Sequence, residues 1–552
     1  MDTPQGDAPL ISIITPVYDT PEQVLRAMID SVRSQSFPNW ELCLVDDRSP
    51  SRRPWKILQE YAEIDPRIRI RRREENGGIV AASNDCLEMA RGEFVSFLDH
   101  DDELYEDALA ETVRALQSAP DVDYVYTDED KLDEAGHRNG PFYKPDWSPE
   151  RFRYQMYTCH FGTMRRSVVT EVGGFRADYE GSQDFDLVFR VTEKARTIVH
   201  IPKVLYGWRI IAGSAAGDPT AKPYAYIAGQ RAIQSHCDRV GFEAECVHDT
   251  ALPGWYRLRP RLTERPPVSI VIPTNGVQSV IHGERQSLVR NCVSSVLEKS
   301  SYDDVEIVVV ADDVMAPDAV DDLVELGGGR LRVVRFSKPF NFSEKVNLGV
   351  AHARHDHLVI LNDDIEVISP EWIESLLMYS RYDKVGAVGP KLLFEDGTIQ
   401  HAGIGLCAPA EIGPIHLHRG YGADYHGYFS TIDVAQNMLA VTGACMMTRR
   451  EAFLSVGGFS ERFPLSYNDV DYCLKLWSAG WRVAYNPEVT LHHFESKSRN
   501  PGVAPQELQE FRDRWGHLLG RDPFQRPELF HGSAGQFYDG SYGIGLDRRV
   551  VA

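Results

Sequence analysis

The feature that most constrains this chain is that its sequence contains one series of motifs twice, in the same order. Apolar segments at 11–18 and 268–274 each open a unit, which continues with an acidic strand end, an Asn-bearing helix, an Asp cluster, a Gly-Gly-Phe turn and an acidic helix start. Equivalent positions keep a nearly constant spacing; Asp184 and Asp469, for example, are 285 residues apart. The repeat predicts two copies of one domain. Because the recurring residues are mostly acids, Gly and Asn, it also predicts a repeated site.

The length and composition agree with two globular domains. A chain of 552 residues exceeds what one hydrophobic core accommodates, and its contents of 43% hydrophobic and 25% charged residues are those of ordinary folded protein. Strands alternate with amphipathic helices, so the fold class is α/β, with a mostly parallel sheet in each copy. The expected organisation is a first domain over 8–250, a Pro- and Arg-rich linker over 251–266, a second domain over 267–500 and a tail over 501–552.

Charge and cysteine usage narrow the partners and the compartment. A formal net charge of −22 argues against nucleic acid. The arginine run at 67–73 is interpreted as a solvated edge strand that relieves the overall negative charge, and contact with a phosphate or an anionic headgroup is the alternative. Nine scattered cysteines indicate a reducing compartment. Without a signal or a spanning run, the expected location is cytoplasmic, with at most peripheral contact with the inner face of a membrane. The tail carries an apolar helical stripe that we expect to pack on the second domain: Leu508, Phe511, Trp515, Leu518 and Leu519.

The first candidate site residues follow an early strand. Asp46 and Asp47 end an apolar strand, where a carboxylate can accept hydrogen bonds from a nucleotide base or ribose. A turn residue or a helix cap is the structural alternative. The second copy has Ala311 and Asp312 in these places, so it keeps only the second acid.

The stronger signal is an acidic cluster after a later strand. FVSFLDHDDEL places Asp99 and Asp101 in a D-x-D arrangement, and a divalent cation with oxygen ligands would relieve the repulsion among these carboxylates. The second copy, HLVILNDDIEV, has Asn362 and Asp364 in those positions, with Asp363 between them. One ligand charge is lost, so we expect a weaker metal site there.

Each copy then presents an acid at the start of a helix, Asp184 in the first and Asp469 in the second. Such an acid either caps the helix or accepts a proton as a general base. Its recurrence downstream of the acidic cluster favours the base.

The two copies differ where each unit ends. Trp208 follows Asp184 by 24 residues, and His493 follows Asp469 by the same distance. His492 and His493 are adjacent on an extended segment, so at most one of them faces a metal. Arg209, beside Trp208, could balance phosphate charge in the first copy. The second copy is also longer by 21 residues, in a Gly-, His- and Tyr-rich stretch at 401–430 that we expect to lie near the site.

These motifs together resemble a known family. The order TPVYDT, VDDRS, NGGIVAASN, FLDHDD, GGF and QDFDL is similar to that of the inverting family 2 glycosyltransferases, which have the GT-A fold. The second copy, with FNFSEKVNLG, LNDDIEV, GGFSERF and LHHFES, resembles the rhamnosyltransferase-like branch of bacterial O-antigen and capsule assembly. The resemblance covers roughly residues 10–500.

The resemblance implies a nucleotide-sugar donor, a divalent cation (Mg²⁺ or Mn²⁺) in each domain, a glycan or lipid-linked oligosaccharide acceptor, and inversion in one displacement. The general bases would be Asp184 and Asp469. Metal binding is implied for Asp99, Asp101, Asn362, Asp364 and His493. Donor binding is implied for Thr15, Pro16, Asp46, Asp47, Asn84, Asp99, Thr274, Asp312, Asn347 and Asp363. The family's acidic pair before the base appears here as Gln183-Asp184 and Asn468-Asp469, so only its second member persists.

Three functions remain open at this point. The first is a bifunctional transferase in which each copy adds a sugar, from dTDP-rhamnose or a UDP-sugar, to a growing surface polysaccharide. The second is a transferase with one active domain, the other copy serving as an acceptor-binding or structural module. The third is a sugar nucleotidyltransferase, which is expected to carry a Gly-rich phosphate loop after its first strand; TPVYDT and PTNGVQ do not supply one.

Overall fold

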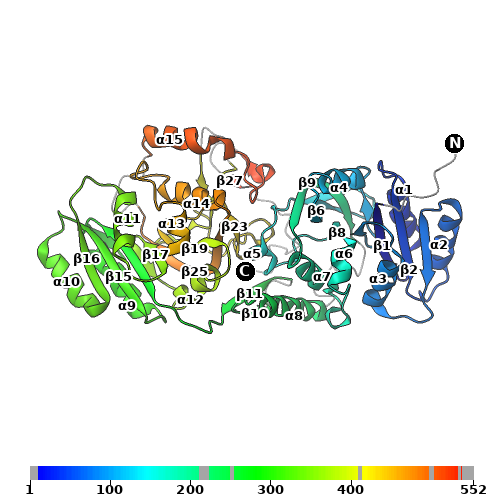
Figure 1. The fold of residues 1–552 in the computed structure, drawn as a ribbon, viewed down its shortest axis with the longest axis horizontal. Coiled ribbons are helices and arrows are strands. Elements are labelled where there is room, and N and C mark those ends of the chain that lie inside the picture. Colours follow the sequence, from blue (N-terminus) through cyan, green and yellow to red (C-terminus); the bar gives the residue numbers. More distant parts are fainter. Residues whose placement is uncertain are drawn as a thin grey trace.

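A computed structural model describes residues 10–210, 223–248, 254–407, 413–495, 503–531 and 536–537. The ends of several expected segments lie outside these residues: 8 and 9 of the first domain, 251–253 of the linker, 496–500 of the second domain and 538–552 of the tail. The described chain forms two α/β lobes joined side by side along the long axis of the molecule (Figure 1).

The first lobe is built on a nine-stranded sheet, with β7 (Arg138–Phe142) attached to β6. The strands nearest the N-terminus are parallel, and β8 enters antiparallel between β4 and β6. In spatial order the main strands are β3 (Ile68–Arg72), β2 (Trp40–Asp46), β1 (Ile11–Val17), β4 (Phe94–Phe97), β8 (Gly162–Arg165), β6 (Val122–Leu132), β9 (Thr197–Arg209) and β5 (Glu103–Leu104).

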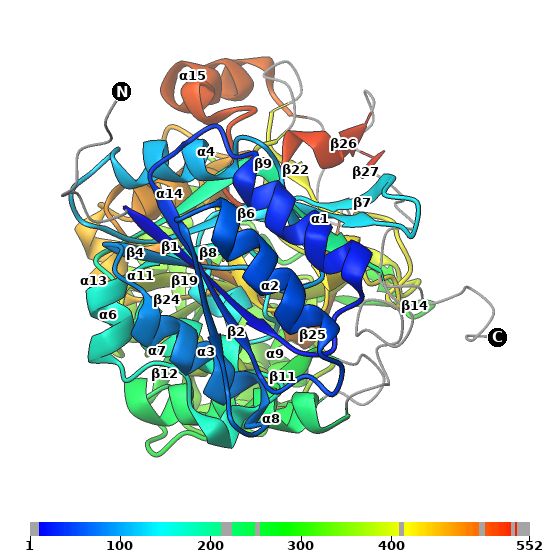
Figure 2. The same cartoon turned by 90° about the vertical axis from the view of Figure 1, so that its right-hand side faces the viewer.

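Helices cover both faces of this sheet because strands buried on both sides need apolar partners on both sides. One face holds a core of its own with the apolar stripes of α1 (Glu22–Arg33), α2 (Arg53–Ile64) and α4 (Ala108–Leu116). Figure 2 shows α1 and α2 together on one side of the strands. The other helices of the first lobe are α3 (Gly78–Met89), α5 (Pro149–Phe152), α6 (Arg166–Glu171), α7 (Gln183–Thr192) and α8 (Pro223–Val240).

The second lobe repeats the same strand order in a ten-stranded sheet. Its main strands are β16 (Leu331–Phe336), β15 (Val305–Asp312), β12 (Val268–Thr274), β17 (His357–Leu361), β24 (Cys445–Arg449), β19 (Val385–Leu393), β25 (Arg482–His493) and β18 (Ile365–Val367). In addition, β20 (Ile399–His401) pairs with β19, and β23 (Gln436–Met438) pairs with β25. Position by position this is the order of the first sheet, so the sequence repeat is a repeat of topology.

The helices of the second lobe are α9 (Leu288–Lys299), α10 (Pro317–Gly327), α11 (Phe342–His352), α12 (Trp372–Ser380), α13 (Arg450–Ser455) and α14 (Asn468–Ser478). Short elements complete it: β13 (Gln278–Ile281), β14 (Glu284–Ser287), β21 (Ile404–Gly405), β22 (Ile415–His416) and the 3₁₀ turn η3 (Tyr428–Ser430). The last three lie in the stretch that makes the second copy longer.

The connection between the lobes has more structure than the sequence predicts. Residues 251–266 were expected to be a linker, but 256–260 form β11 (Tyr256–Pro260), which pairs antiparallel with β10 (Ala244–His248). Tyr256 and Leu258 are buried on this ribbon. The Pro and Arg composition is compatible with this strand, because Arg257 and Arg259 occupy its exposed positions and Pro260 stands at its end.

The two lobes share one hydrophobic core. The apolar cluster on the α3 and α7 face of the first sheet continues without interruption through the second domain. Polar contacts join the lobes as well: Tyr154 Oη and Tyr379 Oη lie 2.9 Å apart, and Arg482 Nε donates to Glu150 Oε1 at 3.0 Å.

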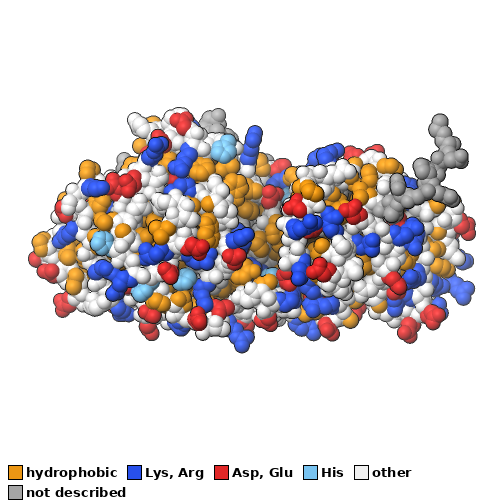
Figure 3. All heavy atoms as spheres, viewed as in Figure 1, with side chains coloured by type: hydrophobic (Ala, Val, Ile, Leu, Met, Phe, Trp, Pro, Cys, Tyr) orange, Lys and Arg blue, Asp and Glu red, His pale blue; other side chains and the backbone are white. Residues whose placement is uncertain are grey.

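On the face shown in Figure 3, basic and acidic side chains are mixed rather than separated by sign.

The tail packs on the second domain, as its apolar stripe predicts. In α15 (Pro505–Trp515), Phe511 is buried and its ring lies 4.9 Å from that of Tyr467. Trp515 Nε1 donates to Asp471 at 2.9 Å. Figure 1 shows α15 above α14. Among the described residues, no helix combines the length and apolarity that crossing a bilayer requires.

Candidate active site

The first domain holds a cleft of about 950 Å³ at the carboxyl ends of its central strands. Four predicted acids line it together, Asp47, Asp99, Asp101 and Asp184, and Pro16, Gln183 and Trp208 line it as well. Its wall also includes Phe429 of the second domain. The carboxyl ends of parallel strands are where open α/β sheets bind ligands, so the fold delivers the acids to a ligand-binding position.

Asp99 and Asp101 lie on the loop that follows β4. The Asp99 side chain is exposed, but only to the cleft, and the protein around it displaces much of its water. This desolvation raises the pKa of its carboxyl group. The charge of His160 opposes the rise in pKa, while Asp101 and Asp184 add to it. Like charges held close together favour binding of a cation.

A buried acid fixes the shape of this loop. Asp102 accepts hydrogen bonds from the Tyr206 hydroxyl and, at 2.8 Å, from the backbone N–H of Arg209. Burial raises the pKa of Asp102 well above its usual range. The Arg209 guanidinium donates to the backbone oxygen of Asp101 at 3.1 Å and pairs with Glu103. Arg209 therefore braces the acidic loop, and its predicted contact with phosphate stays a prediction.

Asp184 is the second residue of α7 and does not cap it. Its carboxylate accepts from the backbone N–H of Phe185 at 2.8 Å, and the surrounding protein raises the pKa of this carboxyl group. Asp186, two residues further along the helix, is instead buried against Arg176 and Arg190. The helix thus presents one acid to the cleft and buries the other as an ion pair. Gln183, before Asp184, accepts from the Gly181 N–H at 2.9 Å.

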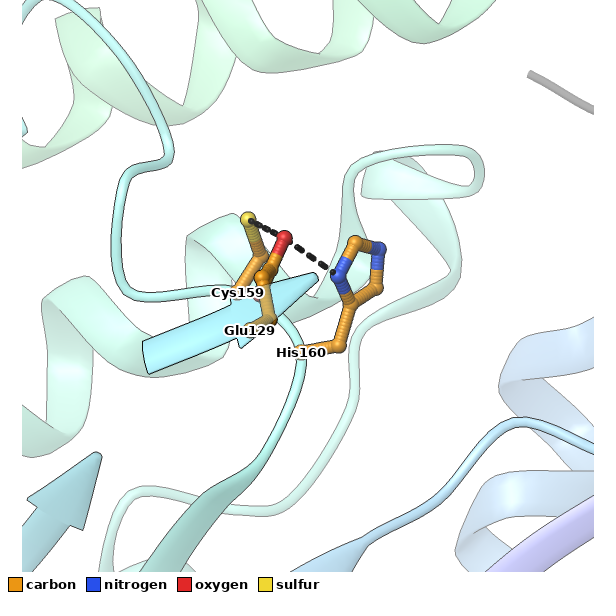
Figure 4. Close-up of side chains that lie close together, drawn as sticks. All are labelled: Glu129, Cys159 and His160. Atoms are coloured by element: carbon orange, nitrogen blue, oxygen red, sulfur yellow. Dashed lines mark hydrogen bonds and ion pairs between the residues drawn. The ribbon is translucent and has the colours of Figure 1, made fainter. Parts of the chain in front are cut away.

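A charged cluster that the sequence analysis did not identify lies beside these acids. Glu129 is buried between Lys144 Nζ at 2.8 Å and His160 Nδ1 at 3.1 Å, and Cys159 Sγ lies 3.9 Å away (Figure 4). Burial by itself would raise the pKa of Glu129, but the two cations lower it to about 2. Burial by itself would lower the pKa of His160, yet the Glu129 carboxylate holds it well above its usual range.

The Glu129 carboxylate therefore favours the charged form of His160, beside the acids of the cleft. Its ring packs against Trp208, with 4.5 Å between the ring centres. Glu129, Cys159 and His160 have the side-chain types of a metal site and lie within 4.8 Å of one another. The Lys144 ammonium, which pairs with the same carboxylate, opposes a cation there because the two positive charges repel each other.

The strand-end acids Asp46 and Asp47 are held by the chain. Asp46 is fully buried and pairs with Arg72 Nε at 2.8 Å. Asp47 accepts from the backbone N–H groups of Gly77 and Gly78 at 2.9 Å and pairs with Arg73. The arginine run lies on and next to the edge strand β3, as the sequence predicts, and Arg72 and Arg73 balance the charge of these two acids. Only Asp47 lines the cleft. Thr15, on β1, is buried with its hydroxyl oxygen unpartnered among the described residues.

The repeated asparagines form the same structural contact in both copies. Asn84 binds the backbone of Phe175 through both its amide atoms, at 2.9 and 3.0 Å, and Asn347 binds Phe459 at the same two distances. Each contact ties the Asn-bearing helix to the Gly-Gly-Phe turn. This explains why the Asn and the turn recur together, and it supports a bracing role beside the donor contact that the resemblance implies.

In the second domain, Asp312 and Asp363 have partners within the protein. The buried Lys345 Nζ lies 2.6 Å from Asp312 Oδ1 and donates to the backbone oxygen of Thr274 at 2.9 Å. The Thr274 hydroxyl donates to Asp363 at 2.6 Å. Burial, together with the neighbouring Asp364, raises the pKa of Asp363 to about 7.

Two of the predicted metal ligands of the second domain, Asp364 and His493, lie together. His493 Nε2 is 3.3 Å from Asp364 Oδ1, while His492 lies on the other side of the strand, with Nδ1 3.2 Å from the Phe394 backbone oxygen. Asn362 Oδ1 and His493 Nδ1 are buried without a hydrogen-bond partner in the part of the chain that the structure describes. Buried polar atoms without partners are rare in native proteins, so these residues fit a bound cation.

Asp469 is more tightly held than its counterpart. It accepts from the Val470 N–H and also, through its other oxygen, from the Gly443 N–H, both at 2.8 Å. Asn468 donates to the Leu465 backbone oxygen at 3.1 Å. The next backbone amide along, Thr442 N–H, points to His401 Nε2 at 3.4 Å, and His401 Nδ1 lies 3.1 Å from His416 Nδ1. These two histidines belong to the extra stretch at 401–430, which the sequence places near the site without identifying them.

Comparison with known proteins agrees with this repeat. Residues 12–173 match the family described as glycosyl transferase family 2, and residues 266–516 match the family described as glycosyltransferase like family 2. The chain therefore belongs to glycosyltransferase family 2 and carries two tandem domains of it.

Two similar proteins span most of this chain. An uncharacterized protein of Sinorhizobium fredii is 38% identical over 95% of the chain, and the O-antigen biosynthesis protein RfbC of Myxococcus xanthus is 37% identical over 94%. The chain covers 58% and 40% of their respective lengths. Among solved structures, Staphylococcus aureus TarS 1–349 in complex with UDP-GlcNAc aligns with a TM-score of 0.34 at 20% identity, covering 41% of this chain and 66% of that one.

Proposed function

We propose that the first domain transfers a sugar from a nucleotide-sugar donor to a glycan acceptor, with inversion at the anomeric carbon. The single observation that carries this proposal is the cleft in which Asp99, Asp101 and Asp184 face one space at the carboxyl ends of the strands. Family membership supports the class of reaction, and the cleft supports the location of the reaction in the first domain.

Asp184 is proposed as the general base. In an inverting transfer the acceptor hydroxyl attacks the anomeric carbon, its proton passes to a carboxylate, and the bond from the sugar to the diphosphate breaks with its electron pair on the leaving group. A carboxylate whose pKa is raised by burial accepts a proton more readily than an ordinary one. No second carboxylate is needed, because no covalent sugar–enzyme intermediate forms.

Asp99 and Asp101 would hold a divalent cation, which when bound neutralises charge on the diphosphate. These two residues fit a cation because several carboxylates are crowded on one loop and because the pKa of Asp99 is raised. His160 is proposed as a positioning residue: its positive charge favours the ionised forms of Asp99 and Asp184, which keeps both ready to bind or to accept a proton.

The second domain is proposed as a second transfer site, which would make the chain bifunctional. Two observations favour this: Asp364 lies next to His493, and Asn362 Oδ1 and His493 Nδ1 are buried without a hydrogen-bond partner among the described residues. The alternative is that this domain binds the acceptor or serves structurally. It draws support from Lys345, which lies buried against the one strand-end acid this copy retains.

The donor is proposed to be dTDP-rhamnose or a UDP-sugar, and the acceptor a growing bacterial surface glycan carried on a lipid at the inner face of the membrane. The similarity to a protein named for O-antigen biosynthesis supports the acceptor class. Contact with the membrane would be peripheral.

The test is a calorimetric titration of the full chain with UDP, dTDP and GDP in the presence of Mn²⁺. We expect one of these nucleotides to bind, and Asp99→Asn to weaken that binding. Transfer is then assayed with the corresponding nucleotide sugar. A chain that binds none of the three nucleotides would overturn the proposal for both domains.

A further inference from the structure

One wall of the first-domain cleft comes from the second domain. Phe429 lies in η3, within the stretch that makes the second copy longer than the first, and it lines the cleft with the residues of the first domain. Its ring stacks on Phe142 of β7 with 3.9 Å between centres and 18° between planes. The cleft is therefore complete only when both domains are present.

Hydrogen bonds of Phe429 and of the residue before it fix this turn to the first domain. The neighbouring Tyr428 hydroxyl donates to the Pro141 backbone oxygen at 2.5 Å and accepts from the Tyr143 N–H at 3.0 Å. The backbone oxygen of Phe429 accepts from Gln155 Nε2 at 3.4 Å. All three partners belong to the first domain, so the turn is docked onto the domain whose cleft it lines.

The backbone at this point adopts a conformation that bulky residues avoid. Phe429 has a φ of 47° and Ser430 a φ of 57°, two consecutive residues other than glycine in the left-handed region. This conformation costs free energy for any side chain with a Cβ atom. Such strain persists where surrounding contacts impose it, and it clusters at ligand-binding sites.

The cleft has two chemically different parts. Carboxylates lie at the strand ends, where the diphosphate and its cation are proposed to bind. Aromatic side chains make up much of the rest: Phe142, Trp208, Tyr224, Tyr226, Trp255 and Phe429. Flat apolar rings pack against the C–H faces of pyranose sugars, while the polar edges of the sugar reach hydrogen-bonding groups. Phe429 therefore belongs to a surface suited to a carbohydrate chain.

We propose that Phe429 is an acceptor-binding residue of the first-domain site, so that the second copy of the fold completes the glycan subsite of the first. This inference rests on the proposed function. It gives the longer stretch of the second copy a role at the other domain's site.

The test compares variants of the full chain on an immobilised array of bacterial oligosaccharides, in the presence of Mn²⁺ and the nucleotide that binds the wild type. Phe429→Ala should weaken glycan binding on the order of tenfold and leave nucleotide affinity unchanged. Phe429→Tyr, which keeps a ring, should bind as the wild type does. Phe429→Gly accepts the left-handed backbone and removes the ring, so it should keep the fold of the turn and still lose glycan binding.

A matched control is Tyr421→Ala. Tyr421 lies in the same stretch and stacks on Tyr425 at 4.5 Å, but it does not line the cleft. This variant should leave glycan binding unchanged. Unchanged glycan binding in both Phe429→Ala and Phe429→Gly, or equal loss in Tyr421→Ala, would overturn the inference. So would a wild type that binds nucleotide but no glycan, whereas a wild type that binds no nucleotide would first overturn the proposed function.

Discussion

The two domains have the same strand order and different ways of balancing the charge of their acids. At the offset of 263 residues that relates Asn84 to Asn347, Ala82 of the first copy corresponds to Lys345 of the second. Ala82 lines the open cleft, whereas Lys345 is buried against Asp312. The first domain thus balances Asp47 with Arg73 and has a small residue at position 82, whereas the second places its cation at the equivalent of that position. A duplicated fold retains its backbone, and single substitutions decide how much of each site stays open.

The second difference is in the side chains that surround the general-base candidates. By the offsets of 263 and 284 residues, Glu129 and His160 correspond to Leu392 and Ala444. The first domain therefore has a buried ion cluster where the second has apolar side chains. Among the described residues, Asp184 accepts a hydrogen bond from the N–H of the next residue alone, while Asp469 is also held by Gly443, which replaces Cys159. The first base is left freer to move and to accept a proton.

The largest expected effect distinguishes the two bases. Asp184→Asn removes the proton acceptor and keeps the size and hydrogen bonding of the side chain, so we expect kcat of one transfer to fall about 10²–10⁴-fold. Asp469→Asn should affect a different linkage. Analysis of the products of each variant measures this. If Asp469→Asn leaves every linkage intact, the second domain is an accessory module and the chain has one active site.

The buried ion cluster, which the second domain lacks, should contribute to the stability of the chain. Glu129→Gln leaves Lys144 and His160 without their counter-charge, which we expect to cost about 3–5 kcal/mol in chemical denaturation. A control is Glu22→Gln, which removes a surface ion pair with Arg53 and should change stability little. A loss no larger than that of the control would contradict the ionised cluster.

The same variant carries a pH dependence with a defined sign. The pKa of Glu129 is lowered to about 2 from an ordinary value of 4.5. Its ionised form therefore stabilises the fold fully above pH 4.5, and this contribution is lost as the pH falls towards 2. The stability gap between wild type and Glu129→Gln should narrow across that window. Denaturation curves at several pH values would show it, and a gap that widens on acidification would contradict it.

A reciprocal exchange of residues tests whether Lys345 prevents nucleotide binding in the second domain. Ala82→Lys should place an ammonium group against Asp47 and weaken nucleotide binding in the first cleft by roughly tenfold. Lys345→Ala should free Asp312 and raise the number of nucleotides bound per chain. Calorimetry with UDP and dTDP measures both, with Ala81→Lys, outside the cleft, as the control. Tighter binding by Ala82→Lys would instead identify Lys345 as a phosphate contact.

The sequence predicted the two-fold repeat, the α/β class and the packing of the tail, because these follow from periodic apolar residues and from motif order. It also identified the acids that share the first cleft. It did not identify Glu129, His160 or Phe429. Glu129 lies within the long strand β6, and the pairing of β6 with β8 brings it next to His160. Phe429 lines the first-domain cleft although it belongs to the second domain. Such contacts depend on three-dimensional arrangement, which no local pattern records.

The smallest expected effect concerns the cation. The first domain offers two carboxylates, Asp99 and Asp101, where the second offers Asn362 and Asp364, and ligand charge tunes the affinity of such sites. We therefore expect two classes of Mn²⁺ binding in the full chain without donor, differing by about tenfold, with Asp101→Asn removing the tighter class and Asp364→Asn the weaker one. Calorimetry of the two variants decides the order. Should Asp364→Asn remove the tighter class, the unpartnered His493 nitrogen and Asn362 oxygen outweigh the missing carboxylate, and the second domain is the better-preserved metal site.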